Sequence, residues 1–315
     1  MDALHLESYV RWWVVRLIHQ TQIHGKDRIF ILNTCHKIIF NSEWTKKRFF
    51  LGLENFYHNS EKIEVIYQST SRKKVNIKKK EKIITFVGKL NRSKGYDLFG
   101  KAILKILNEF KDWKAIVFGD EHREKINFNH KRLIKMGYKS NDTILKSYEK
   151  SSIAVACSRW DEPFGRASLE AASRGSAVII SNRGGLPETS SSAIILKSLN
   201  KANLYKEIRN LITNKKKLIN KQKANYKDFF LTHEYVTNII DKIRSKLLYK
   251  SIFNINRKSK LKILHITNFN YRYFGRLQYN TGIRINNGLI REGHNVLSLS
   301  DRDLVSYTKS IRDPS

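Results

Sequence analysis

The stretch that most restricts the fold of this chain is residues 153–188, where an apolar run, a turn, a helical run ended by glycine and a second apolar run follow in order. This pattern is typical of a strand, helix, strand unit. Glu162 lies in the loop after Ala156, and Glu170 follows eight positions later on the expected helix. Both carboxylates can therefore face one crevice beyond the carboxyl end of the strand, where open α/β sheets bind their ligands.

The spacing of this segment resembles the Glu-x7-Glu signature of the retaining glycosyltransferases of the group-1 type. The resemblance implies the GT-B fold of two facing Rossmann-like domains and the use of nucleotide-sugar donors. The positions that fall at family spacing are Ser158, Glu162, Phe164, Gly165, Glu170, Ala171, Gly175 and residues 184–188.

Strands and helices alternate downstream of a lysine-rich stretch at residues 72–82, which we interpret as a linker. Such alternation predicts right-handed crossovers and a parallel sheet. The expected fold class is α/β, with a GT-B-like, Rossmann-type parallel sheet over residues 83–249 as the complete donor half. Within it we expect a strand at 83–87, a loop at 88–95 and helices at 96–110, 142–149 (capped by Asn141), 201–213 and 217–246.

Residues 1–71 resemble the last part of the acceptor-side domain of the family, with the beginning of that domain missing. A strand is expected at 37–41, a helix capped by Ser42 follows it, and a second strand is expected at 61–67. Residues 3–20 have a helical pattern of tryptophans and arginines. This helix could lie on a membrane interface, but we favour packing within a truncated domain.

The last part of the chain, after a second linker at 250–260, predicts a partial second Rossmann-like domain over residues 261–315. Its strand at 261–267, helix at 280–291 and following strand resemble the start of a GT-B N-terminal domain. Two explanations stay open: a truncated second module, which we favour, or a segment that folds back and pairs its first strand with the strand at 37–41.

The formal net charge of +32 in 315 residues raises the question of a polyanionic partner. The excess is mostly lysine spread along the chain, which favours a compositional bias. No basic and aromatic nucleic-acid motif accompanies it, so we expect no specific nucleic acid, while peripheral membrane contact stays open. No apolar run reaches the ~20 residues that cross a bilayer. Cys35 and Cys157 lie far apart, which fits a cytoplasmic protein, with the inner membrane surface as an alternative location.

The loop at 88–95 carries the candidate phosphate-binding residues Gly88, Lys89 and Lys94. Sugar transfer from a nucleotide diphosphate builds negative charge on the leaving phosphate, and cations placed there stabilise it. The amides at the start of the next helix also favour anions. By resemblance both lysines hold the diphosphate, although the family usually has arginine at position 89. The competing interpretation of either lysine is a solvated surface charge.

Two carboxylates are the candidate sugar-binding residues. Glu170 suits the vicinal ribose hydroxyls, as acidic residues do in nucleotide-binding α/β domains, or it simply favours a helix N-terminus. By resemblance Glu162, with the amides of Phe164 and Gly165, holds the donor sugar. The alternative for Glu162 is a loop carboxylate paired with Arg159 or Arg166. Gly184 and Gly185 would let the backbone approach the ligand closely.

The function that these residues predict is transfer of a sugar from a nucleotide-diphosphate sugar to a glycan or lipid-linked hydroxyl acceptor, with retention. Glu162, Lys94 and Lys89 would serve catalysis by positioning and charge stabilisation, since no covalent nucleophile is evident. No cofactor and no metal are expected. One alternative is a non-catalytic nucleotide-sugar-binding remnant or split half, and a weaker one is a basic membrane-surface or nucleic-acid-binding protein.

Overall fold

A computed structural model of the chain describes residues 25–53, 60–250, 260–267, 269 and 281–300. It divides into two compact units, Met1–Leu247 and Leu248–Ser315. The expected helix at 3–20 and most of the linker at 250–260 lie outside the described residues. The finer domain boundaries remain predictions.

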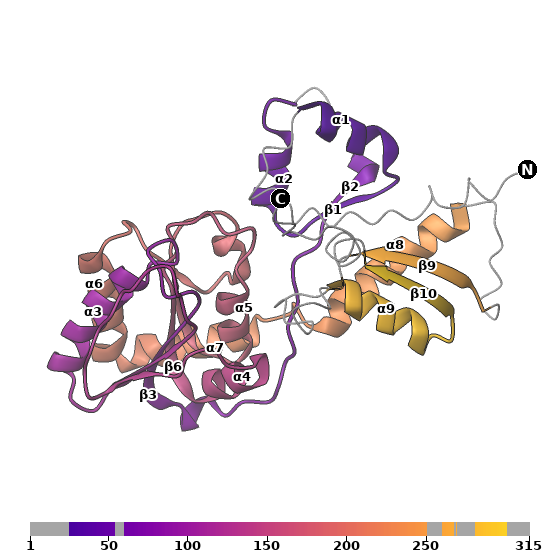
Figure 1. The fold of residues 1–315 in the computed structure, drawn as a ribbon. Helices are drawn as coiled ribbons and strands as arrows, with labels where there is room; N and C mark the ends of the chain where they lie inside the picture. Colours follow the sequence, from indigo (N-terminus) through magenta and orange to yellow (C-terminus); the bar gives the residue numbers. More distant parts are fainter. Residues whose placement is uncertain (1–24, 54–59, 251–259, 268, 270–280, 301–315) are drawn as a thin grey trace, which may run out of the picture. The chain divides into compact units, whose positions relative to one another are not determined.

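The larger unit is built on a six-stranded sheet whose strands are all parallel (Figure 1). The strand order is β5-β4-β3-β6-β7-β8, so the two central strands are β3 and β6. This arrangement confirms the predicted α/β class and the Rossmann-like parallel sheet. The strands are β3 (Glu81–Val87), β4 (Lys114–Phe118), β5 (Leu133–Lys135), β6 (Ser151–Ala156), β7 (Ala177–Ile180) and β8 (Ile194–Ile195).

Helices cover both faces of the sheet because successive side chains of a strand point to opposite faces. In β7, Ala177 and Ile179 pack into the core beneath α3 and α6, whereas Val178 and Ile180 pack beneath α4 and α5. The two pairs of helices lie on opposite sides of the sheet in Figure 1. From β3 to residue 250 the helices are α3 (Tyr96–Glu109), α4 (Asn141–Lys150), α5 (Arg166–Ser173), α6 (Lys201–Thr213), α7 (Lys215–Lys227) and α8 (His233–Lys250).

The predicted helix at 217–246 is wrong, because the chain forms α7 and α8 with a break between them. Phe229 and Leu231 are buried in the core beneath α4 and α5, and the Leu231 carbonyl accepts from the Thr70 amide at 3.1 Å. In an uninterrupted helix the Leu231 carbonyl would accept from an amide of its own helix, and Phe229 and Leu231 would point in different directions. Helix-forming residues on both sides of the break hid it from the sequence pattern.

Two smaller boundaries also differ from the prediction. Asn141 is the first residue of α4, and the cap is Ser140, whose hydroxyl accepts from the Thr143 amide. Strand β3 begins at Glu81, inside the stretch predicted as linker, because Glu81 already pairs with Ser151 of β6.

The segment before the sheet contains α1 (Gly25–Thr34), β1 (Ile38–Phe40), α2 (Glu43–Phe50) and β2 (Ile63–Val65). Strands β1 and β2 pair in parallel. Ser42 caps α2 as predicted, and it forms a reciprocal capping box with Thr45. The aromatic rings of Phe40, Phe49 and Phe50 pack together over this short sheet.

The smaller unit contains β9 (Lys262–Thr267), α9 (Thr281–Arg291) and β10 (Asn295–Ser300), with the two strands parallel. Within the described residues β9 pairs with β10 and β1 pairs with β2. The choice between a truncated second module and a segment that folds back therefore stays a prediction. In the same part of the chain, no helix is both long and apolar enough to cross a membrane.

Candidate active site

The candidate site lies between β3 and β6, where the order in which strands are added to the sheet reverses. From β3 the chain proceeds to β4 on one side, and from β6 it proceeds to β7 on the other, which leaves a crevice beyond the carboxyl ends of β3 and β6. Lys94 follows β3 and Glu162 follows β6. The Lys94 Nζ lies 2.5 Å from the Glu162 Oε1, and the two side chains are 31% and 15% exposed. The structure thus brings two predicted site residues together.

The loop after β3 is fixed by close backbone approaches. The Gly88 amide donates to the Phe118 carbonyl at 3.0 Å, and a Cβ on Gly119 would lie 1.9 Å from the Gly88 carbonyl oxygen. The Lys94 amide donates to the Asn91 Oδ1 at 3.0 Å. These contacts hold Lys94 just before α3, at the helix start where the sequence predicts a phosphate-binding residue.

Gly95, the residue that precedes α3, has a φ of 74°. A Cβ at this position would lie 2.0 Å from the Cys157 carbonyl oxygen, so the loop touches the end of β6. The Ser93 carbonyl, two residues earlier, accepts from the amides of Arg159 and Trp160 at 2.8 and 3.1 Å. Hydrogen bonds therefore join the loop after β3 to the loop after β6.

Lys89, the second predicted cation of the site, is exposed. No hydrogen bond or ion pair joins it to Lys94 or Glu162 within the described residues. Lys89 differs in this respect from Lys94, whose ammonium group is bound by the Glu162 carboxylate.

The loop that carries Glu162 rests on the glycines after β7. The Gly185 amide donates to the Glu162 carbonyl at 2.6 Å, and the backbones of Glu162 and Gly184 pair in an isolated parallel β-bridge. A Cβ on Gly184, which has a φ of 60°, would lie 2.1 Å from the Glu162 carbonyl oxygen. Both predicted glycines thus serve a close backbone approach, although their partner here is the Glu162 loop.

Phe164 and Gly165 complete this loop. Phe164 is 1% exposed and stacks on the ring of Tyr67 with centroids 5.4 Å apart. Gly165 has a φ of 114° and precedes α5, where a Cβ would lie 2.6 Å from Leu186. The buried ring and the glycine fix the direction of the two backbone amides predicted to face the sugar.

Glu170 is almost fully buried, with 4% of the residue exposed. Its Oε1 accepts hydrogen bonds from the Asn141 Nδ2 and the Arg166 Nη2, both at 2.9 Å. A carboxylate buried to this extent requires such partners. The sequence interpretation missed Asn141, which it treated as a helix cap. Its position at the start of α4, in the segment that follows the carboxyl end of β5, was the feature that could have indicated a site role.

The structure also shows which carboxylates Arg159 and Arg166 bind. Arg166 binds Glu170 and Arg159 binds Asp97, while Glu162 binds Lys94. The alternative interpretation, in which Glu162 pairs with Arg159 or Arg166, is therefore not observed among the described residues. No group of three or more His, Cys, Asp or Glu side chains in these parts of the chain is arranged to hold a metal ion.

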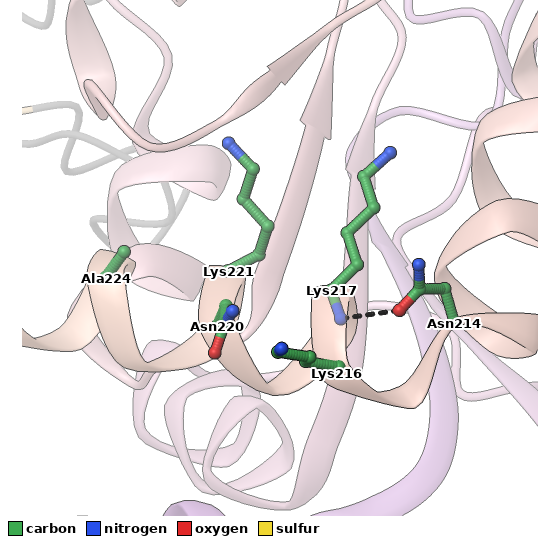
Figure 2. A pocket seen from close by; sticks show the side chains of 6 residues that line it. All are labelled: Asn214, Lys216, Lys217, Asn220, Lys221 and Ala224. Carbon is green, nitrogen blue, oxygen red and sulfur yellow. Dashed lines mark hydrogen bonds between the residues drawn. The ribbon is translucent and has the colours of Figure 1, made fainter.

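A hollow of about 450 Å³ lies away from these residues, on the lysine-rich helix α7 (Figure 2). Asn214 caps this helix, and its Oδ1 accepts from the Lys217 amide at 2.8 Å. The Lys221 Nζ donates to the Ser192 carbonyl at 3.0 Å. None of the residues predicted to bind the nucleotide sugar lines this hollow. Its lining consists of Asn214, Lys216, Lys217, Asn220, Lys221 and Ala224.

Residues 68–228, just over half of the chain, match the family model described as glycosyl transferases group 1. The chain therefore belongs to this family. It is 32% identical over 124 residues to an uncharacterized glycosyltransferase of Methanocaldococcus jannaschii, a match that covers 37% of this chain and 31% of that protein. It is 26% identical over 229 residues to an uncharacterized 41.2 kDa protein in the cps region of Klebsiella pneumoniae, covering 61% and 63%. The chain thus spans less than two thirds of the length of these curated relatives.

Solved structures support the same fold. The crystal structure of Anabaena HepE in complex with UDP-glucose aligns with a TM-score of 0.57 and 16% identity, over 70% of this chain and 68% of that one. A glycosyltransferase from Rickettsia africae aligns with a TM-score of 0.57 and 18% identity, over 73% and 69%. At such identities the likeness concerns the fold.

Proposed function

We propose that this chain binds a nucleotide-diphosphate sugar beyond the carboxyl ends of β3 and β6 and transfers the sugar to a hydroxyl acceptor with retention. The observation that carries the proposal is the 2.5 Å contact between Lys94 and Glu162 at the crossover of the sheet. Membership of the glycosyl transferases group 1 family supports it. So does the fold shared with a protein that was crystallised with UDP-glucose.

In this proposal Lys94 and Lys89 hold the diphosphate together with the Gly88 loop and the start of α3. Breaking the bond between the anomeric carbon and the phosphate oxygen leaves the electron pair on that oxygen, and the two ammonium groups stabilise it. Lysine at position 89 supplies a point charge, whereas an arginine would supply a bidentate fork. Lys94 has three N–H donors, so it can contact a phosphate and Glu162 together.

Glu162 and Glu170 make up the proposed Glu-x7-Glu pair. Glu162, with the amides of Phe164 and Gly165, holds hydroxyls of the donor sugar. Glu170 accepts hydrogen bonds from the ribose hydroxyls, and Asn141 and Arg166 keep its carboxylate in place. The two acids therefore bind different parts of one ligand. Binding of a nucleotide alone depends on the Glu170 contacts, whereas binding of a nucleotide sugar depends on the Glu162 contacts as well.

Retention in this proposal results from attack of the acceptor on the face that the phosphate leaves. The acceptor oxygen forms the new bond to the anomeric carbon, and its proton passes to the leaving phosphate oxygen. No protein nucleophile takes part, so the contribution of the chain is positioning and charge stabilisation. We assign no cofactor and no resident metal to this step.

The acceptor in this proposal is a hydroxyl of a glycan or of a lipid-linked acceptor in the cytoplasm. Helix α7 has six lysines, Lys215, Lys216, Lys217, Lys221, Lys223 and Lys227, and no acidic residue. Such a surface is attracted to an anionic bilayer face. Peripheral contact with the inner membrane surface is therefore part of the proposal.

Calorimetry with UDP, GDP and ADP, followed by the sugar conjugates of the nucleotide that binds, tests the proposal. Lys94→Ala should weaken nucleotide-sugar binding about tenfold or more, whereas Lys101→Ala, an exposed lysine on α3, should leave it unchanged. Donor hydrolysis and transfer are then measured with the same variants. Absence of binding by any of the three nucleotides would refute the proposal, and binding without turnover would favour the non-catalytic module.

A further inference from the structure

The loop between β7 and β8 contains Glu188, a residue to which the proposed function gives no role. Its Oε2 accepts a hydrogen bond from the Glu43 amide at 2.7 Å, and its Oε1 accepts one from the Trp44 amide at 2.9 Å. These are the first two residues of α2. Amides at this end of a helix have no partner within the helix, so a carboxylate that accepts two of them binds strongly and in one orientation.

The same helix start makes a second contact with the loop after β6. The Ser42 hydroxyl donates to the Pro163 carbonyl at 2.5 Å. Gly185 fits between them, since a Cβ there would lie 2.5 Å from the Pro163 carbonyl oxygen and 3.0 Å from the Ser42 side chain. The beginning of α2 therefore bonds both to the loop of Glu162 and to the loop of Glu188.

The two loops are joined to each other as well. The Gly185 amide donates to the Glu162 carbonyl at 2.6 Å, and Leu186 packs against Phe164 and Gly165. A displacement of the loop that contains Glu188 would thus move the backbone that carries Glu162.

Tyr67 extends this cluster from the strand segment before the linker. Its ring stacks on Phe164. Burial, together with the negative charges of Glu188 and Glu43 and a hydrogen bond to Glu188, raises the pKa of the Tyr67 hydroxyl. The tyrosine is therefore a neutral neighbour for the Glu188 carboxylate.

We propose that Glu188 is a positioning residue that fixes the sugar-binding loop 162–165 by bonding it to the N-terminus of α2. The inference rests on the proposed function, because the effect is expected on the sugar half of the donor. Glu170, which the proposed function places on the ribose, is held by Asn141 and Arg166. Loss of the Glu188 carboxylate should therefore weaken the sugar contacts and leave the nucleotide contacts in place.

Calorimetry on the full chain separates these two halves. For each of UDP, GDP and ADP, the dissociation constant of the nucleotide is compared with that of its glucose conjugate. Glu188→Ala should weaken the conjugate about tenfold, because small displacements of positioning groups have effects of this size, and should change the nucleotide by less than about twofold. Glu188→Gln retains one accepting oxygen and should lie between Glu188→Ala and the wild type.

The matched control is Glu109→Ala, because Glu109 also binds two partners, Tyr205 and Arg209, but joins α3 to α6. It should leave both dissociation constants unchanged. Equal weakening of the nucleotide and the conjugate by Glu188→Ala would mean a general structural role and would overturn the inference, as would no change in either.

Amide hydrogen exchange supplies a test that does not need the ligand. In Glu188→Ala and Glu188→Gln, exchange should become faster at 43–46 and also at 162–166, whereas in Glu109→Ala both segments should exchange as in the wild type. If residues 162–166 exchange at the wild-type rate in both Glu188 variants, Glu188 does not position the loop. If the wild type binds no nucleotide, the proposed function fails, and exchange alone decides whether the loop is held in this way.

Discussion

The guanidinium of Arg159 binds the carboxylate of Asp97 through two parallel hydrogen bonds of 2.6 and 2.8 Å. Arg159 belongs to the loop after β6, and Asp97 is the second residue of α3, the helix after β3. The same guanidinium donates to the Arg92 carbonyl at 2.6 Å. This pair therefore joins the two loops of the candidate site across the crossover of the sheet, beside the contact between Lys94 and Glu162.

The Asp97 carboxylate should make the stability of the chain depend on pH in the acid range. Burial alone would raise the pKa of Asp97, but the hydrogen bonds and charge of Arg159, with backbone amides of the helix start, outweigh it and lower this pKa. Because the folded value lies below the unfolded value of about 3.9, the stabilisation is present above that value. It is lost as pH falls through the folded pKa.

We expect Asp97→Asn to lower the free energy of unfolding by about 1 kcal/mol at pH 7. Water screens the pair, since the Arg159 side chain is 37% exposed. The difference from wild type should shrink below about pH 4, as measured by urea unfolding from pH 3 to 7. Asp241→Asn, which removes an exposed pair with Arg244, is the control and should have little effect. A difference for Asp97→Asn that stays constant down to pH 3 would contradict the assignment.

Asn141 should affect nucleotide binding without affecting the stability of α4. Its amide holds the Glu170 carboxylate at 2.9 Å, while Ser140 caps the helix. A hydrogen bond to a charged group contributes about 1.5 kcal/mol, so Asn141→Ala should weaken nucleotide binding roughly tenfold. Calorimetry should show this loss, whereas thermal unfolding should show only a small decrease in Tm, because Arg166 still binds the buried Glu170 carboxylate. Asp142→Ala, one residue later on the same helix, is the control and should alter neither quantity.

The sequence predicted the elements of the sheet better than the contacts of the site. Apolar runs such as residues 83–87 predict buried strands because both faces of a parallel sheet are covered. The partner of Glu162 could not be predicted, because Arg159 and Arg166 lie near it in the sequence, whereas Lys94, which binds it in the fold, lies 68 positions away. The contact between Glu188 and α2 joins segments separated by more than a hundred residues, and no local period reports such a contact.

Gly95 should tolerate no side chain. Its φ is 74°, and a Cβ would lie 2.0 Å from the Cys157 carbonyl oxygen. Gly137 has a similar φ of 64°, but a Cβ there would have no neighbour within 4 Å, so it measures the cost of the backbone conformation alone. We expect Gly137→Ala to cost about 1 kcal/mol and Gly95→Ala to cost about 3 kcal/mol or more, as measured by urea unfolding. Equal costs for the two variants would mean that the loop moves away from β6 easily.

Cys157 should be chemically inert in the folded chain. It is fully buried at the end of β6, and its thiol donates to the Gly95 carbonyl at 3.3 Å. Burial raises the pKa of this thiol to about 12, so the reactive thiolate is about a thousandfold scarcer than for a free cysteine. Mass spectrometry after treatment with iodoacetamide at pH 8 should find Cys157 unmodified in the native chain and modified in urea. Rapid native labelling would contradict its burial.

Lys80 lies at the other end of the sheet, where its ammonium group donates to the carbonyls of Tyr148, Glu149 and Ser151 at 2.9, 3.3 and 2.8 Å. These carbonyls belong to the end of α4, a position that favours a cation. Burial nevertheless lowers the pKa of Lys80 to about 7, and the charge of Glu149 offsets only part of that effect.

A lowered lysine pKa means that the unfolded chain binds more protons than the folded chain between about pH 7 and 10.5. Relative to Lys80→Met, which cannot titrate, wild-type stability should therefore rise with pH across this window, by at most about 1.4 kcal/mol per pH unit. Below pH 7 the difference should be constant, because both states are protonated. Urea unfolding of both proteins from pH 6 to 10 measures it, with the exposed Lys78→Met as control. Methionine should be tolerated because the Ser176 hydroxyl still donates to the carbonyls of Tyr148 and Ser151. Parallel curves for wild type and Lys80→Met would show that the three carbonyls keep the ammonium group charged throughout.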